Sequence, residues 1–140
     1  MPNSYSIHPE QNLIRQILWG RVTVDELRDI TEQIRSDSRY RKGMDVLADL
    51  RNAQIDISYA QMTDYTRFMA GNTTIGRQAI VVSRQLEFGM ARMYEQLTES
   101  SVLRIDLRVF LDMEEAERWM ATAQVAADVR EAPDSKVEGT

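Results

Sequence analysis

The segment VLADLRNAQIDISYAQM, from Val46 to Met62, gives the clearest indication of the chain's architecture. It begins with three consecutive apolar residues, as expected for a strand that is covered on both faces. It ends in a predicted helix, because Ser58 and Gln61 have the spacing of a capping box, in which each side chain bonds the other residue's backbone N–H. The stretch therefore predicts a buried strand that leads through a polar junction into a capped helix.

Strands and helices alternate on both sides of this stretch. Strands over residues 4–8 and 12–19, joined by the turn HPEQN, precede a helix capped by Thr23. A buried strand through residues 79–82, a helix from Leu86, a strand in IDLRVFLD and a last helix opened by Asp112 follow the stretch. This ββαβαβαβα order predicts an α/β fold, with a mixed, mostly parallel five-stranded sheet, an N-terminal antiparallel hairpin and four helices.

Length and composition bound the class of protein. A chain of 140 residues indicates one domain, over residues 1–123, and the loss of periodicity beyond it predicts a disordered acidic C-terminal tail over residues 124–140. The absence of cysteine excludes a disulfide scaffold and a Cys-ligated zinc site, and it fits a cytoplasmic protein. The net charge of −5 argues against nucleic-acid binding. No apolar run is long enough for a membrane span.

Polar candidate site residues lie where two of the predicted parallel strands end. Asp49, Arg51 and Asn52 follow the first strand, and Ser83 and Arg84 follow the second. Ligands of open α/β sheets bind beyond the carboxyl ends of the strands, and both junctions lead into helix N-termini, which attract anions. The residues are therefore either a small anion site or solvent-facing arginines, one of which pairs with Asp49.

A second candidate site is apolar. Phe68 and Phe88 are not easily placed on the core stripes of their helices. Methionines at helical spacing accompany them, namely Met62, Met69, Met90 and Met93, and the helix from Leu86 is expected to turn Leu86 and Met93 inward. The pattern indicates either plain core or an apolar groove between the two middle helices, which would bind a lipid or form a homodimer contact.

The sequence contains no recognisable catalytic set. Its single histidine, His8, lies at the hairpin turn beside Pro9, and no Ser-His-Asp arrangement can be assembled around it. No group of His, Asp and Glu has the spacing of metal ligands. We therefore expect a non-enzymatic protein without a metal ion or a cofactor.

Four segments resemble the STAS superfamily in their order and pattern: GRVTVDEL, DVLADLRNA, AIVVSRQLEFGMARMYEQL and LRVFLDMEEAERWM. The likeness covers roughly residues 4–121 and is closest to the SpoIIAA-like branch of small stand-alone bacterial proteins. It implies a SpoIIAA-like sheet with helices mainly on one face, and a regulatory or protein-interaction domain with a protein partner. The wider relatives include CRAL-TRIO lipid-carrier domains, so a carrier or sensor of a small anionic or lipid ligand is the alternative.

The resemblance also bears on phosphorylation. Anti-sigma-factor antagonists of this superfamily carry a phosphorylated serine in a D-S-S-G-like pattern at the start of the corresponding helix. Here Asp56 matches the aspartate, the acceptor position falls on Ile57, or on Ser58 if the loop shifts by one residue, and the glycine is Ala60 or absent. Ser58 is thus a candidate phosphorylation site, and its capping-box spacing gives it a structural role as the alternative.

Overall fold

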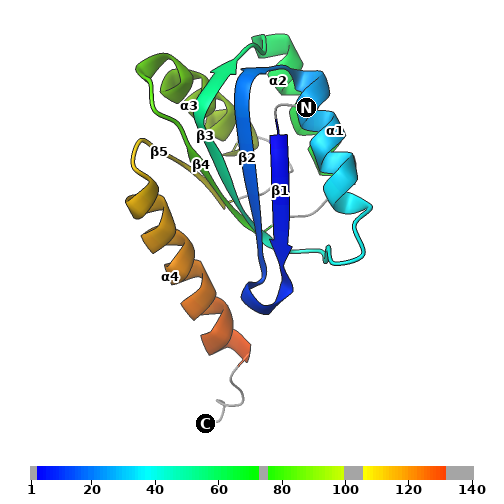
Figure 1. Ribbon diagram of the computed structural model, residues 1–140, viewed down its shortest axis with the longest axis vertical. Helices are drawn as coiled ribbons and strands as arrows, with labels where there is room; N and C mark the ends of the chain where they lie inside the picture. The colour runs from blue at the N-terminus through cyan, green and yellow to red at the C-terminus, as the bar shows by residue number, and fades with distance from the viewer. Residues whose placement is uncertain (1–2, 73–75, 100–105, 132–140) are drawn as a thin grey trace.

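The computed structural model describes residues 3–72, 76–99 and 106–131. Its elements are β1 (Asn3–His8), the 3₁₀ helix η1 (Pro9–Gln11), β2 (Leu13–Val22), α1 (Val24–Arg35), β3 (Asp45–Ile55), α2 (Tyr59–Asn72), β4 (Arg77–Val81), α3 (Gln85–Glu99), β5 (Asp106–Phe110) and α4 (Met113–Glu131). The strands form one sheet in the order β1-β2-β3-β4-β5 (Figure 1). Only the β1–β2 pair is antiparallel in this sheet, so the predicted mixed α/β topology is confirmed.

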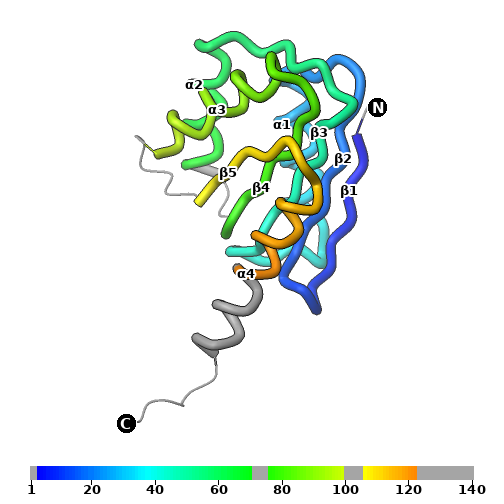
Figure 2. The backbone as a smooth tube through the Cα atoms, turned by 90° about the vertical axis from the view of Figure 1, so that its left-hand side faces the viewer, coloured from blue at the N-terminus to red at the C-terminus, as the bar shows by residue number. Residues whose placement is uncertain are grey.

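Helices cover both faces of the sheet unequally (Figures 1 and 2). The alternation of the strands turns Ala48 and Ile80 toward one face, where they pack with α1 and α3, and α2 lies over the same side. Leu47 and Val81 point to the other face and pack against Ala116 and Met120 of α4, in one core cluster with Leu13 and Ala79. The middle strands are therefore buried on both sides, which is why they read as continuous apolar runs.

Both predicted capping boxes are present. At the start of α1 the Thr23 N–H donates to the Glu26 side chain at 2.9 Å, and the Glu26 N–H donates back to the Thr23 hydroxyl. Before α2 the Ser58 N–H donates to Gln61 Oε1 at 2.9 Å, and the Gln61 N–H donates to Ser58 Oγ at 3.1 Å. Ser58 thus has the structural role that its spacing predicts, and its phosphorylation stays a prediction.

A β-bulge changes how the opening stretch folds. β3 does not end at the predicted polar junction but runs through it to Ile55, and its pairing with β2 slips by one residue, since Ile17 lies opposite Asp49 and Trp19 opposite Asn52. The extra residue resets the alternation, so that Leu50 and Ala53 are buried in the same core cluster although they are three residues apart. The polar junction expected after a strand is therefore part of one.

Two further expectations differ from the structure. Leu86 and Met93 do not point inward on α3 but are 68% and 36% exposed, while Glu87 and Thr98 are buried in their place. α4 continues through residues 124–131, which were expected to belong to the tail, because QVAADVRE is composed largely of good helix formers. Residues 132–140 lie outside the described residues.

Candidate functional site

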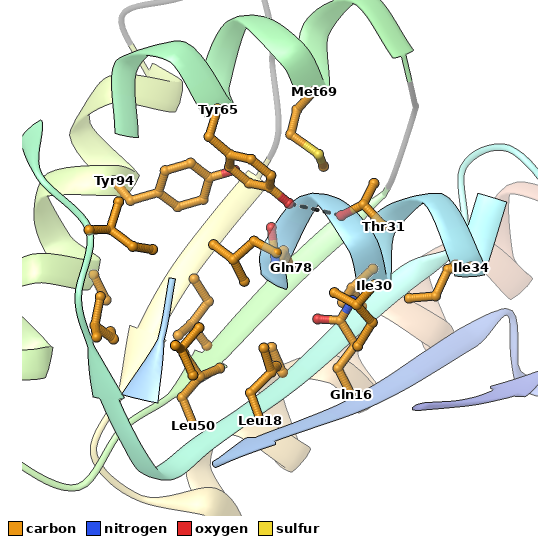
Figure 3. Close-up of a pocket in the computed structure, with 18 of the residues that line it drawn as sticks. Gln16, Leu18, Ile30, Thr31, Ile34, Leu50, Tyr65, Met69, Gln78 and Tyr94 are labelled. Atoms are coloured by element: carbon orange, nitrogen blue, oxygen red, sulfur yellow. Dashed lines mark hydrogen bonds between the residues drawn. The ribbon is translucent and has the colours of Figure 1, made fainter. Parts of the chain in front are cut away.

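A cavity of about 110 Å³ lies between the sheet and helices α1, α2 and α3 (Figure 3). Its sheet wall includes Leu18 and Ala48, and Ala91 of α3 lies on its helical wall. Both alanines are buried, at 2% and 4% exposure, and their short side chains leave space that larger residues would fill. Protein interiors contain few voids larger than a water molecule, so a cavity of this size is a candidate binding site.

Polar side chains interrupt the apolar walls of this cavity. Gln16 of β2 and Gln78 of β4 lie on the sheet wall, and Thr31 and Tyr65 share a hydrogen bond of 2.9 Å between their hydroxyls on the helical side (Figure 3). Burial raises the pKa of the Tyr65 hydroxyl, against the hydrogen bond with Thr31 and the charge of Arg28, and burial also raises the pKa of Tyr94 well above 10. These groups are therefore neutral at physiological pH.

Neither glutamine is among the site residues predicted from the sequence. Each occupies a core-facing position of its strand, between Ile14 and Leu18 in one case and two residues before Ile80 in the other. A polar residue at such a position is the signal that could have identified them, because buried polar groups need a partner.

Only some of the residues predicted for an apolar site line the cavity. Met62, Met69 and Met90 line the cavity. Phe68 stacks on Tyr65, with ring centroids 5.9 Å apart, and Phe88 packs against the main core cluster. Neither phenyl ring is among the described residues that form the cavity walls.

The structure pairs Asp49 with Arg51. Nε and Nη2 of Arg51 each donate to one oxygen of Asp49 at 2.9 Å, and the Arg51 N–H adds a bond of 3.1 Å. These hydrogen bonds lower the pKa of Asp49, against the effect of its burial. Ser83 Oγ donates to the carbonyl of Arg51 at 2.5 Å, which brings the two predicted junctions together, while Asn52 is exposed beside them.

Arg84 turns to a different partner. Its Nε and Nη2 donate to the two carboxylate oxygens of Glu87 at 2.9 Å each, and the Glu87 side chain is only 3% exposed. Glu87 also accepts the Ile55 N–H at 3.3 Å, so it joins the end of β3 to the first turn of α3. Glu87 is not among the residues predicted from the sequence, although an acid three residues after an arginine on a helix is a recognised pairing signal. Both rim arginines thus already carry a counter-charge.

The Asp49–Arg51 pair predicts a pH-dependent stability. Because the folded pKa of Asp49 lies below its ordinary value of 3.8, the pair stabilises the fold above that pH and loses its contribution as the pH falls through the folded value. Arg51→Ala should therefore lower the free energy of unfolding by up to about 1 kcal/mol near neutral pH, and by less at a pH well below 3.8. Urea unfolding at the two pH values measures the difference in the free energy of unfolding between the wild-type chain and the variant. An equal difference at the two pH values, or the same pH dependence in the control Asn52→Ala, would contradict a stabilising Asp49–Arg51 pair.

The single histidine is not isolated. Ser6 Oγ lies 2.9 Å from His8 Nε2, and His8 Nδ1 lies 3.9 Å from a Glu10 oxygen. The second distance is longer than a hydrogen bond, so the contact lacks the bonded acid that orients the histidine of a catalytic triad. No cluster of three metal-ligating side chains occurs in residues 3–72, 76–99 and 106–131. None of the described helices has an apolar stretch long enough to cross a membrane.

The comparisons with known proteins bear on the fold. No protein-family model matches the sequence, and no curated protein matches it. The structure is similar to the crystal structure of an uncharacterized protein of the DUF3478 family with a SpoIIAA-like fold, from Shewanella loihica PV-4. The two share 15% sequence identity with a TM-score of 0.58, over 84% of this chain and 93% of the other. The chain is thus an α/β protein of the SpoIIAA-like fold, as the sequence resemblance implies.

Proposed function

We propose that this chain is a ligand-binding domain that holds a small, mainly apolar molecule between its sheet and helices α1, α2 and α3. The cavity of about 110 Å³ is the observation that supports this function. An apolar cavity of about 150 Å³ in another protein stays dry and binds benzene, so the space is comparable with one that admits a small ligand. The adaptable side chains of Met62, Met69 and Met90 would let the walls follow ligands of different shape.

The rim supports an anion ligand less well. An anion at Arg51 or Arg84 would compete with Asp49 or Glu87, each of which already forms a two-point pair with its arginine. Binding there would leave a carboxylate without its partner, and Glu87 is almost completely buried. We therefore place the ligand in the cavity and not at the sheet rim.

Thermal unfolding in the presence of 1-octanol tests the proposal. A ligand that binds only the folded chain raises its stability by mass action, by about 2.7 kcal/mol at a free concentration one hundred times the Kd. We expect a concentration-dependent rise in Tm and a one-to-one complex in native mass spectrometry. The absence of both, for 1-octanol and for its neutral eight-carbon analogues, would contradict a ligand-binding function for this cavity.

An exposed apolar surface bears on the alternative of protein interaction. Ile17 and Trp19 of β2 are 48% and 42% exposed, and the alternation of β2 turns them to the sheet face that α4 covers in part. Exposed large apolar side chains that lie together are typical of contact surfaces. A regulatory role, a protein partner and a homodimer stay predictions, and sedimentation equilibrium of the purified chain tests the last of them.

A further inference from the structure

We infer that the cavity selects a neutral amphiphile, such as an alcohol or a primary amide, whose polar group bonds the side-chain amide of Gln78. The inference rests on the proposed function and names the chemical class of its ligand. Its starting point is a polar group without a partner: Gln78 Oε1 is buried, and no described residue forms a hydrogen bond with it. A buried polar atom of this kind is costly to leave unbonded and calls for a partner that the protein itself does not supply.

The position of Gln78 shows what surrounds this amide. In the sheet it lies between Val46 of β3 and Leu107 of β5, both of which are buried apolar residues. Along its own strand the next residue on the same face is Ile80, which also lines the cavity. The amide is therefore a polar point in an apolar wall, and it would fix the orientation of a ligand whose remaining surface is apolar.

Other neutral groups lie around the same part of the cavity. We call Gln16, Thr31, Tyr65 and Gln78 the polar belt. Figure 3 shows these side chains at the cavity, with the Tyr65 and Thr31 hydroxyls bonded to each other. Apolar wall residues adjoin the belt along β2 on both sides, at Ile14 and Leu18. A ligand that matches this pattern has an apolar body and one hydrogen-bonding group.

The charges around the cavity favour a neutral ligand over an ion. The belt carries amide and hydroxyl groups only, and Arg35 is the one charged residue among the described residues that line the cavity. Arg35 is already paired with Glu32. Arg28, which precedes Arg35 on α1, lies over the Phe68 ring, 5.0 Å from its centroid, and its charge lowers the pKa of Tyr65. Its Nε is buried without a hydrogen bond to a described residue, but Arg28 is not among the described residues that line the cavity. Among the described residues of the cavity wall, a carboxylate at the belt would thus meet only Arg35, which is already paired, and it would lose its hydration.

Four probes of similar length test this inference on the wild-type chain: 1-octanol, octanamide, sodium octanoate and heptyl methyl ether. The ether is an isomer of 1-octanol that lacks the O–H donor, so the two differ in hydrogen bonding and not in composition. We expect 1-octanol and octanamide to bind roughly tenfold more tightly than the ether, as one buried hydrogen bond allows, and octanoate to bind most weakly. Calorimetric titration measures the affinities.

The variant Gln78→Leu tests whether the Gln78 amide causes the preference for 1-octanol over the ether. In this variant 1-octanol should lose its advantage over the ether, while the ether binds within about threefold of its wild-type affinity. Gln54→Leu, the same change at an exposed position of β3, should retain the wild-type preference. If Gln78→Leu fails to fold, the affinities of the two isomers for the wild-type chain still test whether the cavity selects a hydrogen-bond donor.

Three results would overturn the inference. Equal wild-type affinity for 1-octanol and the ether would mean that the Gln78 amide bonds internal water and forms no hydrogen bond with the ligand. Tightest binding of octanoate would mean that a cation governs the site. Binding of none of the four probes would overturn the proposed function together with the inference, whereas the first two results leave the proposed function intact.

Discussion

Replacing Ala48 with leucine is expected to weaken 1-octanol binding at least roughly tenfold while the chain stays as stable as wild type, or gains about 0.5–2 kcal/mol. Ala48 is 2% exposed and lines the cavity, so the added carbons would occupy the space of the ligand. Filling an existing cavity restores contacts that the wall otherwise lacks, which offsets the strain of a larger side chain. Titration with 1-octanol and urea unfolding measure the two effects.

Ala53 provides a matched control for this substitution. It lies on the same strand and in the same core cluster, is 4% exposed, and is not among the described residues that line the cavity. Ala53→Leu should therefore overpack the core, lower the free energy of unfolding by about 1–3 kcal/mol and leave 1-octanol binding intact in the folded protein. Equal effects of the two substitutions on stability and on binding would mean that the cavity is not an open space in solution.

Arg84→Ala is expected to lower the free energy of unfolding by about 2 kcal/mol. The substitution removes both hydrogen bonds to the Glu87 carboxylate, whose side chain is 3% exposed, and leaves that charge buried with the Ile55 N–H. Arg84 itself is 52% exposed, so water offsets part of the loss, and the expected cost is smaller than for a fully buried pair. Urea unfolding near neutral pH measures the change.

Arg67→Ala is the control for the ion pair. Arg67 and Asp64 have the same three-residue spacing, but both side chains are more than half exposed, at 76% and 61%. Cutting this pair should change the free energy of unfolding by no more than about 0.5 kcal/mol. If the two arginine substitutions cost the same, the buried carboxylate of Glu87 does not join β3 to α3 as we describe.

The two kinds of site identified in this fold differ in how their polar groups are satisfied. At the rim Arg51 is paired with Asp49, and Arg84 is paired with Glu87. These ion pairs contribute to holding the ends of the strands together. In the cavity Gln78 Oε1 forms no hydrogen bond with a described residue, and the other groups of the polar belt are neutral. The first arrangement is typical of structure and the second of recognition, which is why we assign ligand binding to the cavity.

The order of the elements and the ends of several of them could be predicted from the sequence. The capping boxes at Thr23 and Ser58 and the apolar runs at residues 46–48 and 79–82 are local patterns, and each acts on residues only a few positions away. Right-handed crossovers between such elements leave few ways to assemble them, so the α/β fold could be predicted without coordinates.

Which of these residues contact one another depends on how the elements pack together. The bulge between β2 and β3 places Leu50 and Ala53 on one face, and the partner of Arg84 is Glu87 and not Asp49. The cavity exists because the register of the sheet and the position of α3 put two alanines, Ala48 and Ala91, on its walls. These outcomes depend on contacts between segments far apart in the chain, where a shift of one residue reverses the side that each side chain faces. The register therefore cannot be predicted from local sequence patterns.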